Sequence, residues 1–160
     1  MIVKSLKLGE ASSTSGMIYP VEEMREAIGR YKKTVIPNKC AFGQFVMGSS
    51  YHTEGSIGSI NLSETSHLIL DVGIDSDNYL WAEIKFLDTM LGRLAQNALQ
   101  DNIAWSPRGV GTVDEKTKTI SGYELLGIDC ILKLEIVEQE PPTIPVIEPV
   151  SFWKRLIGWK

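Results

Sequence analysis

The sequence predicts an α+β domain in which an antiparallel, partly closed, barrel-like sheet is flanked by helices. Two observations predict this class. Segments with the character of strands recur along the chain, and only two stretches place apolar residues at helical spacing. A strand-rich order with two helices is typical of an α+β fold whose sheet partly closes on itself. With 160 residues, the chain is long enough to bury a real core within one domain.

Several segments have the composition of strands and are separated by turn-forming residues. The clearest turn is the polar stretch IDSDN, which separates two of them. The predicted strands are Met1–Leu8, Cys40–Met47, His67–Gly73, Tyr79–Leu87, Gly109–Val113, Thr119–Leu125 and Ile128–Val137.

Two segments carry apolar residues that recur every three or four positions, as on one face of a helix. Pro20 opens the first, and Glu22 and Glu23 lie in its first turn, where the helix dipole favours negative charge. Thr89 is expected to cap the second. The apolar faces comprise Val21, Met24, Ala27, Ile28 and Tyr31 in the first helix, and Met90, Leu91, Leu94, Ala95 and Leu99 in the second.

The composition changes after residue 138. The segment EQEPPTIPVIEP is acidic and rich in proline, so it does not form a regular element. An aromatic and basic peptide, SFWKRLIGWK, follows it. We therefore expect residues 1–138 to form the domain and residues 139–160 to form a tail with a docking peptide at its end.

The composition also disfavours several classes of function. A formal net charge of −4 argues against a nucleic-acid binder, which needs a basic face. No apolar run approaches the roughly 20 residues that span a bilayer, and MIVKSLKLGEASSTSG lacks the apolar core of a signal peptide. Cys40 and Cys130 have no metal-binding spacing, so we expect two buried thiols in a reducing cytoplasm and no metal site.

The segment AWSPRGVG, around Ser106, is expected to be a loop and has two interpretations. It is either a polar turn between strands or a nucleophile held beside oxyanion donors. Pro107 fixes one backbone torsion next to the serine, and Arg108 carries a fixed positive charge. Gly109 and Gly111 let backbone N–H groups approach a substrate closely. From these residues alone, both interpretations stay open.

A serine nucleophile needs a base, and the chain has two histidines. His52 lies in GSSYHTEGSIGS, a glycine- and serine-rich segment that can present it to a cleft. His67 begins a strand directly after Ser66. Each also has an ordinary structural interpretation, the first as a solvated loop residue and the second as a hydrogen-bonded residue at a strand start.

Five segments, in order and at similar spacing, resemble the prohead proteases of T-even-type tailed phages, whose fold is shared with herpesvirus assemblins. IYP followed by VEEMREAIGRY is similar to the family's N-terminal helix, and SINLSETSHLILDV to a central strand region. IKFLDTMLGRL resembles a segment with Ile-Leu-Asp-Thr and Gly-Arg. WSPRGVGTV is similar to the nucleophile loop Val-Ser-Ser-Arg-Gly-x-Gly, and YELLGIDCI to the strand after it. The resemblance covers roughly residues 18 to 132.

The resemblance implies a serine endopeptidase whose nucleophile is Ser106. Pro107 replaces the second serine of the family's loop. Arg108 and Gly109 fall on the Arg-Gly pair that shapes the family's oxyanion pocket. On this interpretation the serine in AWSPRGVG is a nucleophile rather than part of a turn.

The resemblance implies His52 as the base, because it completes a Gly-x-x-x-His stretch at the family's spacing, with Thr53 in place of proline. Counted without gaps, the catalytic histidine falls instead on Met47. The protein would then be a catalytically inactive assembly or scaffold protein with a protease fold. The third catalytic residue is also open: assemblins use a second histidine, which corresponds to His67, and Asp71 is the carboxylate alternative.

The resemblance also implies a location and substrates. Such enzymes are enclosed in the assembling procapsid in the host cytoplasm, where they cleave scaffold and major capsid proteins and themselves without any cofactor. T-even-type enzymes favour cleavage after a glutamate that follows Leu or Ile by two residues. Leu8-Gly9-Glu10 and Ile136-Val137-Glu138 fit this pattern, so we expect self-cleavage after Glu10 and Glu138. Assemblins act as dimers, and a homodimer is an open alternative here.

Overall fold

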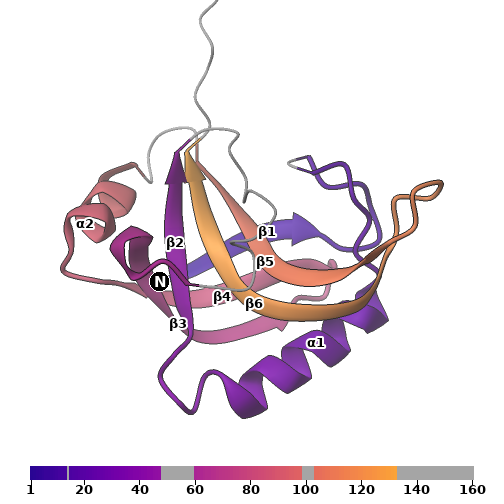
Figure 1. The fold of residues 1–160 in the computed structure, drawn as a ribbon, viewed down its shortest axis with the longest axis horizontal. Coiled ribbons are helices and arrows are strands. Elements are labelled where there is room, and N and C mark those ends of the chain that lie inside the picture. Colours follow the sequence, from indigo (N-terminus) through magenta and orange to yellow (C-terminus); the bar gives the residue numbers. More distant parts are fainter. Residues whose placement is uncertain (14, 48–59, 99–102, 133–160) are drawn as a thin grey trace, which may run out of the picture.

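The computed structural model describes residues 1–13, 15–47, 60–98 and 103–132 (Figure 1). The predicted base His52, the expected cleavage residue Glu138 and the tail at 139–160 lie outside these ranges, so the division into domain and tail stays a prediction. The strands are β1 (Ile2–Lys7), β2 (Phe42–Met47), β3 (Thr65–Ile74), β4 (Tyr79–Phe86), β5 (Ile103–Val113) and β6 (Ile120–Leu132). The helices are α1 (Val21–Thr34), α2 (Met90–Asn97) and the short 3-10 helix η1 (Leu62–Glu64).

The strands form one six-stranded mixed sheet in the order β1-β4-β3-β2-β6-β5. Neighbouring strands are antiparallel except β2 and β6, which run parallel. The expected α+β class is confirmed, whereas the expectation of an antiparallel sheet is wrong at this pair. Parallel neighbours need a long connection between them, and here that connection contains β3, β4, α2 and β5. Such a long-range pairing leaves no trace in local periodicity.

The sheet curls into a half-barrel, so that its two edge strands approach each other. β1 and β5 are the first and last strands of the sheet order, yet the Ser5 hydroxyl donates to the Trp105 carbonyl oxygen at 2.8 Å. Figure 1 shows the arrows of these two strands close together. Strand twist accumulates across the sheet and brings its edges round toward each other. We call the boundary between Lys4–Leu6 of β1 and Ile103–Trp105 of β5 the seam.

Helix α1 packs against β3 and β6. The Glu23 carboxylate accepts a hydrogen bond from the Tyr123 backbone N–H, and the Arg30 guanidinium donates to the Tyr123 carbonyl oxygen, both at 2.8 Å. These two bonds fix the helix to one residue of β6. The face that the helix buries is the predicted one and comprises Met24, Ala27, Ile28 and Tyr31.

Helix α2 begins at its predicted cap. The Thr89 side chain accepts a hydrogen bond from the Gly92 N–H at 3.0 Å, which satisfies one of the free donors of the first turn. Gly92 lies against the backbone of Leu87 and Ser66, and a side chain there would collide with it. The glycine therefore lets the helix approach β3 closely.

Two expectations for the C-terminal half are wrong. The predicted loop AWSPRGVG belongs to β5, and the strands expected at 119–125 and 128–137 are one continuous strand, β6, whose described part ends at Leu132. A proline is tolerated in β5 because that strand lies at the sheet edge. Gly127 does not interrupt β6: a Cβ there would lie 2.8 Å from Arg108 Nη2, so the glycine makes room for a buried side chain.

Candidate functional site

Ser106 lies in β5 directly opposite Asp129 of β6. Opposite residues of an antiparallel ladder project from the same face of the sheet, and Arg108, two positions further along β5, shares that face. All three residues are buried, with exposed fractions of 4% for Ser106, 2% for Arg108 and 0% for Asp129. The serine that the sequence singled out therefore sits beside a buried pair of opposite charges.

The buried charges form a network that joins three strands. Arg108 Nε donates to Asp129 Oδ2 at 2.9 Å, and Asp129 Oδ1 accepts from the Gln44 backbone N–H at 2.9 Å. Arg108 Nη2 also donates to the Phe42 carbonyl oxygen at 3.3 Å. Because buried charges are tolerated only when they are paired and hydrogen-bonded, this network holds β2 in its parallel register beside β6.

Tyr31 of α1 adds a third polar group to this region of the interior. Burial raises the pKa of Tyr31 well above its usual value, and the charges of Arg108 and Asp129 act on that pKa in opposite directions. The Tyr31 hydroxyl and Arg108 Nη1 are buried and have no hydrogen-bond partner within the described part of the chain. Such groups are rare in protein interiors. The network therefore retains hydrogen-bonding capacity that the described residues do not use.

His67 lies at the start of β3 and is fully buried. Its Nε2 is 2.9 Å from the Ile128 carbonyl oxygen, and its Nδ1 is 2.9 Å from the Ser66 hydroxyl. Because a carbonyl only accepts, Nε2 carries the proton and the hydroxyl donates to Nδ1. The ring packs edge-on against Trp105 and Phe86.

This environment fixes the charge state of His67. Burial lowers its pKa to about 4, so the imidazole is neutral near neutral pH. Both ring nitrogens make hydrogen bonds within the core. For His67 to orient a second histidine, one of these hydrogen bonds would have to break. The arrangement corresponds to the structural interpretation of this residue, as a hydrogen-bonded histidine at a strand start.

The other candidates for base and orienting acid are separate from this network or lie outside the described residues. Met47 is the last residue of β2 and pairs with Leu132, so the segment that carries His52 begins at that end of the strand. The Asp71 carboxylate is 2.6 Å from Lys32 Nζ of α1. This hydrogen bond with Lys32 lowers the pKa of Asp71. The Asp71 carboxylate therefore serves an ion pair between β3 and α1.

Pro107 and Gly109 flank Arg108 in β5. Pro107 is buried, and a Cβ on Gly109 would lie 2.5 Å from the Tyr123 ring and its hydroxyl. The pairing of β5 with β6 shifts register between Arg108 and Gly109. Arg108 and Gly109 pair with Gly127 and Leu125, so the residue left without a ladder partner at this bulge is Leu126 of β6. The unpaired backbone of the bulge therefore belongs to β6 and not to the strand of Ser106.

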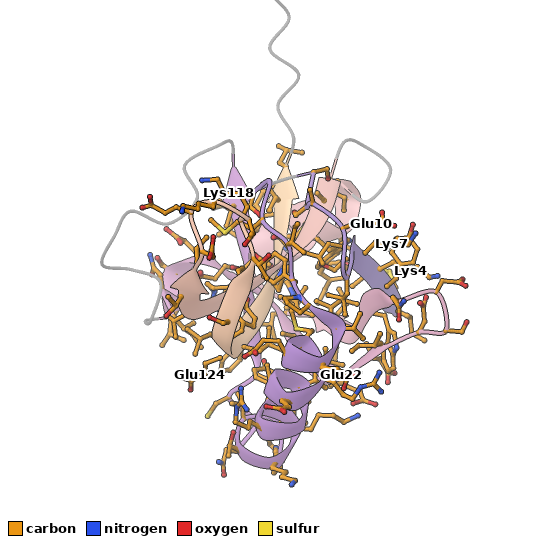
Figure 2. The ribbon with its side chains drawn as sticks, turned by 90° about the vertical axis from the view of Figure 1, so that its right-hand side faces the viewer. Lys4, Lys7, Glu10, Glu22, Lys118 and Glu124 are labelled. Atoms are coloured by element: carbon orange, nitrogen blue, oxygen red, sulfur yellow. The ribbon has the colours of Figure 1, made fainter. Side chains whose placement is uncertain are left out.

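Glu10 lies in the turn after β1 and pairs with Lys7 at 2.6 Å, as Figure 2 shows on one side of the molecule. The preceding residues are part of the folded core. Leu8 is only 2% exposed, and the Gly9 N–H donates to the Tyr19 carbonyl oxygen at 2.9 Å. The first expected cleavage sequence is therefore held within the domain, although its glutamate is exposed.

Asp129, Gln44 and Tyr31 were not predicted as site residues. The sequence did hold a signal for Asp129, which is an acid within the apolar stretch LLGIDCIL and is stable in such a strand only with a partner. Gln44 contributes through its backbone, so its residue type carries no signal. Tyr31 was assigned only to the apolar face of the first helix.

The described ranges contain no group of three His, Cys, Asp or Glu side chains that could hold a metal ion. Cys40 and Cys130 are free thiols. The expectation that both are buried is wrong for Cys40, which is exposed in the turn before β2, where its thiol lies 3.2 Å from the Asn38 carbonyl oxygen. Burial raises the pKa of Cys130 to about 12. Of the helices described, none is long and apolar enough to cross a membrane.

Neither a protein-family model nor a curated protein sequence matches this chain. Its structure matches that of the capsid assembly protease of bacteriophage T4, gp21, with a TM-score of 0.66. The chain shares the fold of this phage protease. The match covers 83% of this chain and 81% of the T4 chain, at 15% sequence identity. The resemblance seen in the sequence is thereby confirmed at the level of the fold.

Proposed function

We propose that this protein is a serine endopeptidase of phage capsid maturation that acts inside the procapsid. The observation that carries the proposal is the position of Ser106, opposite buried Asp129 and two residues before Arg108, in a fold shared with the T4 capsid assembly protease. A rigid strand with locked neighbours holds a nucleophile more accurately than a solvated turn does.

The proposed reaction needs no cofactor. His52 takes the proton of the Ser106 hydroxyl, and the serine oxygen attacks the carbonyl carbon of a peptide bond. Backbone N–H groups beside Arg108 hold the developing oxyanion. The amine leaves with the proton from His52, and water then releases the acyl group from Ser106.

We assign the orientation of the base to Asp129 in place of His67. The Asp129 carboxylate faces the same side of the sheet as Ser106, and its hydrogen bonds with Arg108 and Gln44 hold it in place there. His67, in contrast, has both ring nitrogens engaged in the core. The Arg108 guanidinium positions Asp129, and the oxyanion donors come from the backbone beside it.

The proposed substrates are the scaffold and major capsid proteins and the chain itself, cut after a glutamate that follows Leu or Ile by two residues. Glu138 is the preferred site of self-cleavage because it follows the described domain, whereas the sequence before Glu10 includes the buried residue Leu8. A homodimer stays an open part of this proposal.

Co-expression with scaffold and major capsid proteins, followed by intact-mass analysis of the assembled particles, tests the proposed activity. We expect truncated products with the wild type and none with Ser106→Ala or His52→Ala. Ser121→Ala is the matched control because Ser121 is an exposed serine on β6, and it should cleave as the wild type does. Full-length products from all four proteins would overturn the proposal.

One observation favours a second function, that of an inactive assembly protein that keeps the protease fold. Ser106 is only 4% exposed and lies beside a guanidinium that is committed to Asp129, an arrangement that would also suit a purely structural strand. In that case particle assembly, rather than proteolysis, depends on the chain. Deletion of the gene would then block particle assembly, whereas Ser106→Ala would change neither particle assembly nor the masses of the capsid proteins.

A further inference from the structure

Strands β2 and β6 diverge toward the start of β2, as Figure 1 shows below their arrowheads. Their ladder begins at Phe45 and does not reach the first residues of β2. There, the Phe42 carbonyl oxygen accepts a hydrogen bond from Arg108, and the Gln44 N–H donates to Asp129. We call this part of the boundary between β2 and β6 the gap. Side chains, rather than backbone pairs, therefore set the spacing of the two strands beside the proposed nucleophile.

Gly127 of β6 borders the gap and makes room for the guanidinium of Arg108. The two residues lie opposite each other in the β5–β6 ladder, so the long side chain of Arg108 crosses Gly127 on its way to β2. A Cβ on Gly127 would lie 2.8 Å from Arg108 Nη2, 3.5 Å from Arg108 Cζ and 3.0 Å from the Phe42 carbonyl oxygen. The guanidinium has no free space beside it, because the side chain is 1% exposed and is bonded to both Asp129 and Phe42. A methyl group at position 127 would therefore displace it.

The peptide bond before Asp129 is anchored across the same gap. The carbonyl oxygen of Ile128 belongs to this peptide bond and lies 2.9 Å from His67 Nε2 of β3. The imidazole reaches it past Gly43 of β2, where a Cβ would collide with the ring. Asp129 is thus held through its backbone by His67 and through its carboxylate by Arg108. A glycine lies beside each of these two contacts.

We propose that Gly127 is a positioning residue of the proposed serine protease, because the space beside it lets Arg108 hold the Asp129 carboxylate opposite Ser106. The inference rests on the proposed protease function. Gly127 acts through Arg108 and does not itself need to touch a substrate. A methyl group at this position keeps every charge of the network but moves the guanidinium, so the Asp129 carboxylate loses the partner that fixes its orientation. Ser106 should then become a slower nucleophile in a chain that still folds.

Thermal unfolding tests the space beside Gly127 without any need for activity. Gly127→Ala should lower the melting temperature by about 5 °C, because overpacking a buried site is destabilising. Arg108→Lys keeps the positive charge but removes Nη2, the atom closest to the new methyl group. We therefore expect the double variant to melt at a higher temperature than Gly127→Ala alone. A double variant that shows the sum of the two separate losses would overturn the placement of the guanidinium over Gly127.

A fluorophosphonate probe, added to particles assembled with scaffold and major capsid proteins, tests the effect on Ser106. In the labelling step, Ser106 Oγ bonds to phosphorus as the P–F bond breaks, and the hydroxyl proton leaves with the fluoride. We expect labelling of the wild type and none of Ser106→Ala. Below its melting temperature, Gly127→Ala should be labelled at least about ten times more slowly than the wild type, a change of about 1.4 kcal/mol in the barrier. Addition of Arg108→Lys to this variant should recover part of the rate.

Gly73→Ala is the matched control for overpacking within the same sheet. A Cβ on Gly73 would lie 2.6 Å from the Trp81 ring, at the boundary between β3 and β4 and away from the gap. This variant should melt at a lower temperature than the wild type and be labelled at the same rate. Unchanged labelling of Gly127→Ala, or equal slowing in both glycine variants, would overturn the positioning role. Absence of labelling in the wild type would refute the protease function and the positioning role with it, while the melting temperatures would still decide whether the guanidinium needs the space beside Gly127.

Discussion

Arg108 and Asp129 form an ion pair whose side chains are 1% and 0% exposed, and the pair connects three strands. An isolated buried charge is strongly unfavourable, so each member depends on the other. Ser106 projects from the same face, directly opposite Asp129. The geometry around the proposed nucleophile therefore depends on this ion pair, because substitution of either residue alone leaves the other charge buried and unpaired.

Arg108→Met should lower the free energy of unfolding by about 3 to 5 kcal/mol, because it leaves the Asp129 carboxylate buried without its partner. Arg108→Met combined with Asp129→Leu should recover a large part of this loss. Urea denaturation of the single and double variants measures both effects. Lys4→Ala is the control: it breaks the exposed Lys4–Asp75 pair and should leave the free energy of unfolding close to that of the wild type. An Arg108→Met protein as stable as the wild type would contradict the dependence of stability on the Arg108–Asp129 pair.

His67 should make the fold less stable in acid. Its pKa is about 4 in the folded chain and 6.5 in the unfolded reference, so the unfolded chain binds this proton first as the pH falls. The lowered pKa means that stability rises with pH between about 4 and 6.5, and between pH 7 and 4.5 the residue should account for a loss of about 2 to 3 kcal/mol.

Measurement of the free energy of unfolding across this pH range in wild type and His67→Gln isolates the contribution of the histidine, since the other titrating groups are shared by both proteins. The variant should show a flatter dependence on pH. Two profiles of the same slope would show that the buried imidazole does not resist protonation as its surroundings imply.

Local patterns in the sequence predicted the two helices but not the long-range strand pairing. The expected apolar face of α2 is wrong at Met90 and Leu94, which are 75% and 42% exposed. The buried face of α1 and the Thr89 cap were predictable, because helix periodicity and capping act within a few residues. The strand character of AWSPRGVG was missed because Pro107 and the glycines indicate a turn, and only the position of β5 at the sheet edge permits them. Ser106 was found from its resemblance to a nucleophile loop, whereas Asp129 required the β5–β6 register.

Two glycines offer a matched test of the packing around His67. A Cβ on Gly43 would collide with the imidazole of His67 and with the Ile128 carbonyl oxygen. Gly43→Ala should therefore destabilise the fold by about 1 to 3 kcal/mol. A Cβ on Gly29 of α1 meets nothing within 4 Å, so Gly29→Ala should stabilise the fold by about 0.5 to 1 kcal/mol. Thermal unfolding of both variants should show shifts of opposite sign, and a shared direction would contradict the packing described.

Self-cleavage should occur after Glu138 before it occurs after Glu10. The sequence that precedes Glu10 contains buried Leu8 and a Gly9 N–H bonded to Tyr19, so an extended approach to a protease requires local opening of the domain. An opening free energy of about 3 kcal/mol would slow cleavage there about a hundredfold. A synthetic peptide with the sequence of residues 5–15 lacks this protection and should be cut faster than the same sequence in the folded chain, while its Glu10→Gln counterpart should stay whole. Time-resolved intact-mass spectrometry gives both rates, and equal cleavage of the peptide and the folded chain would show that the domain does not shield this bond.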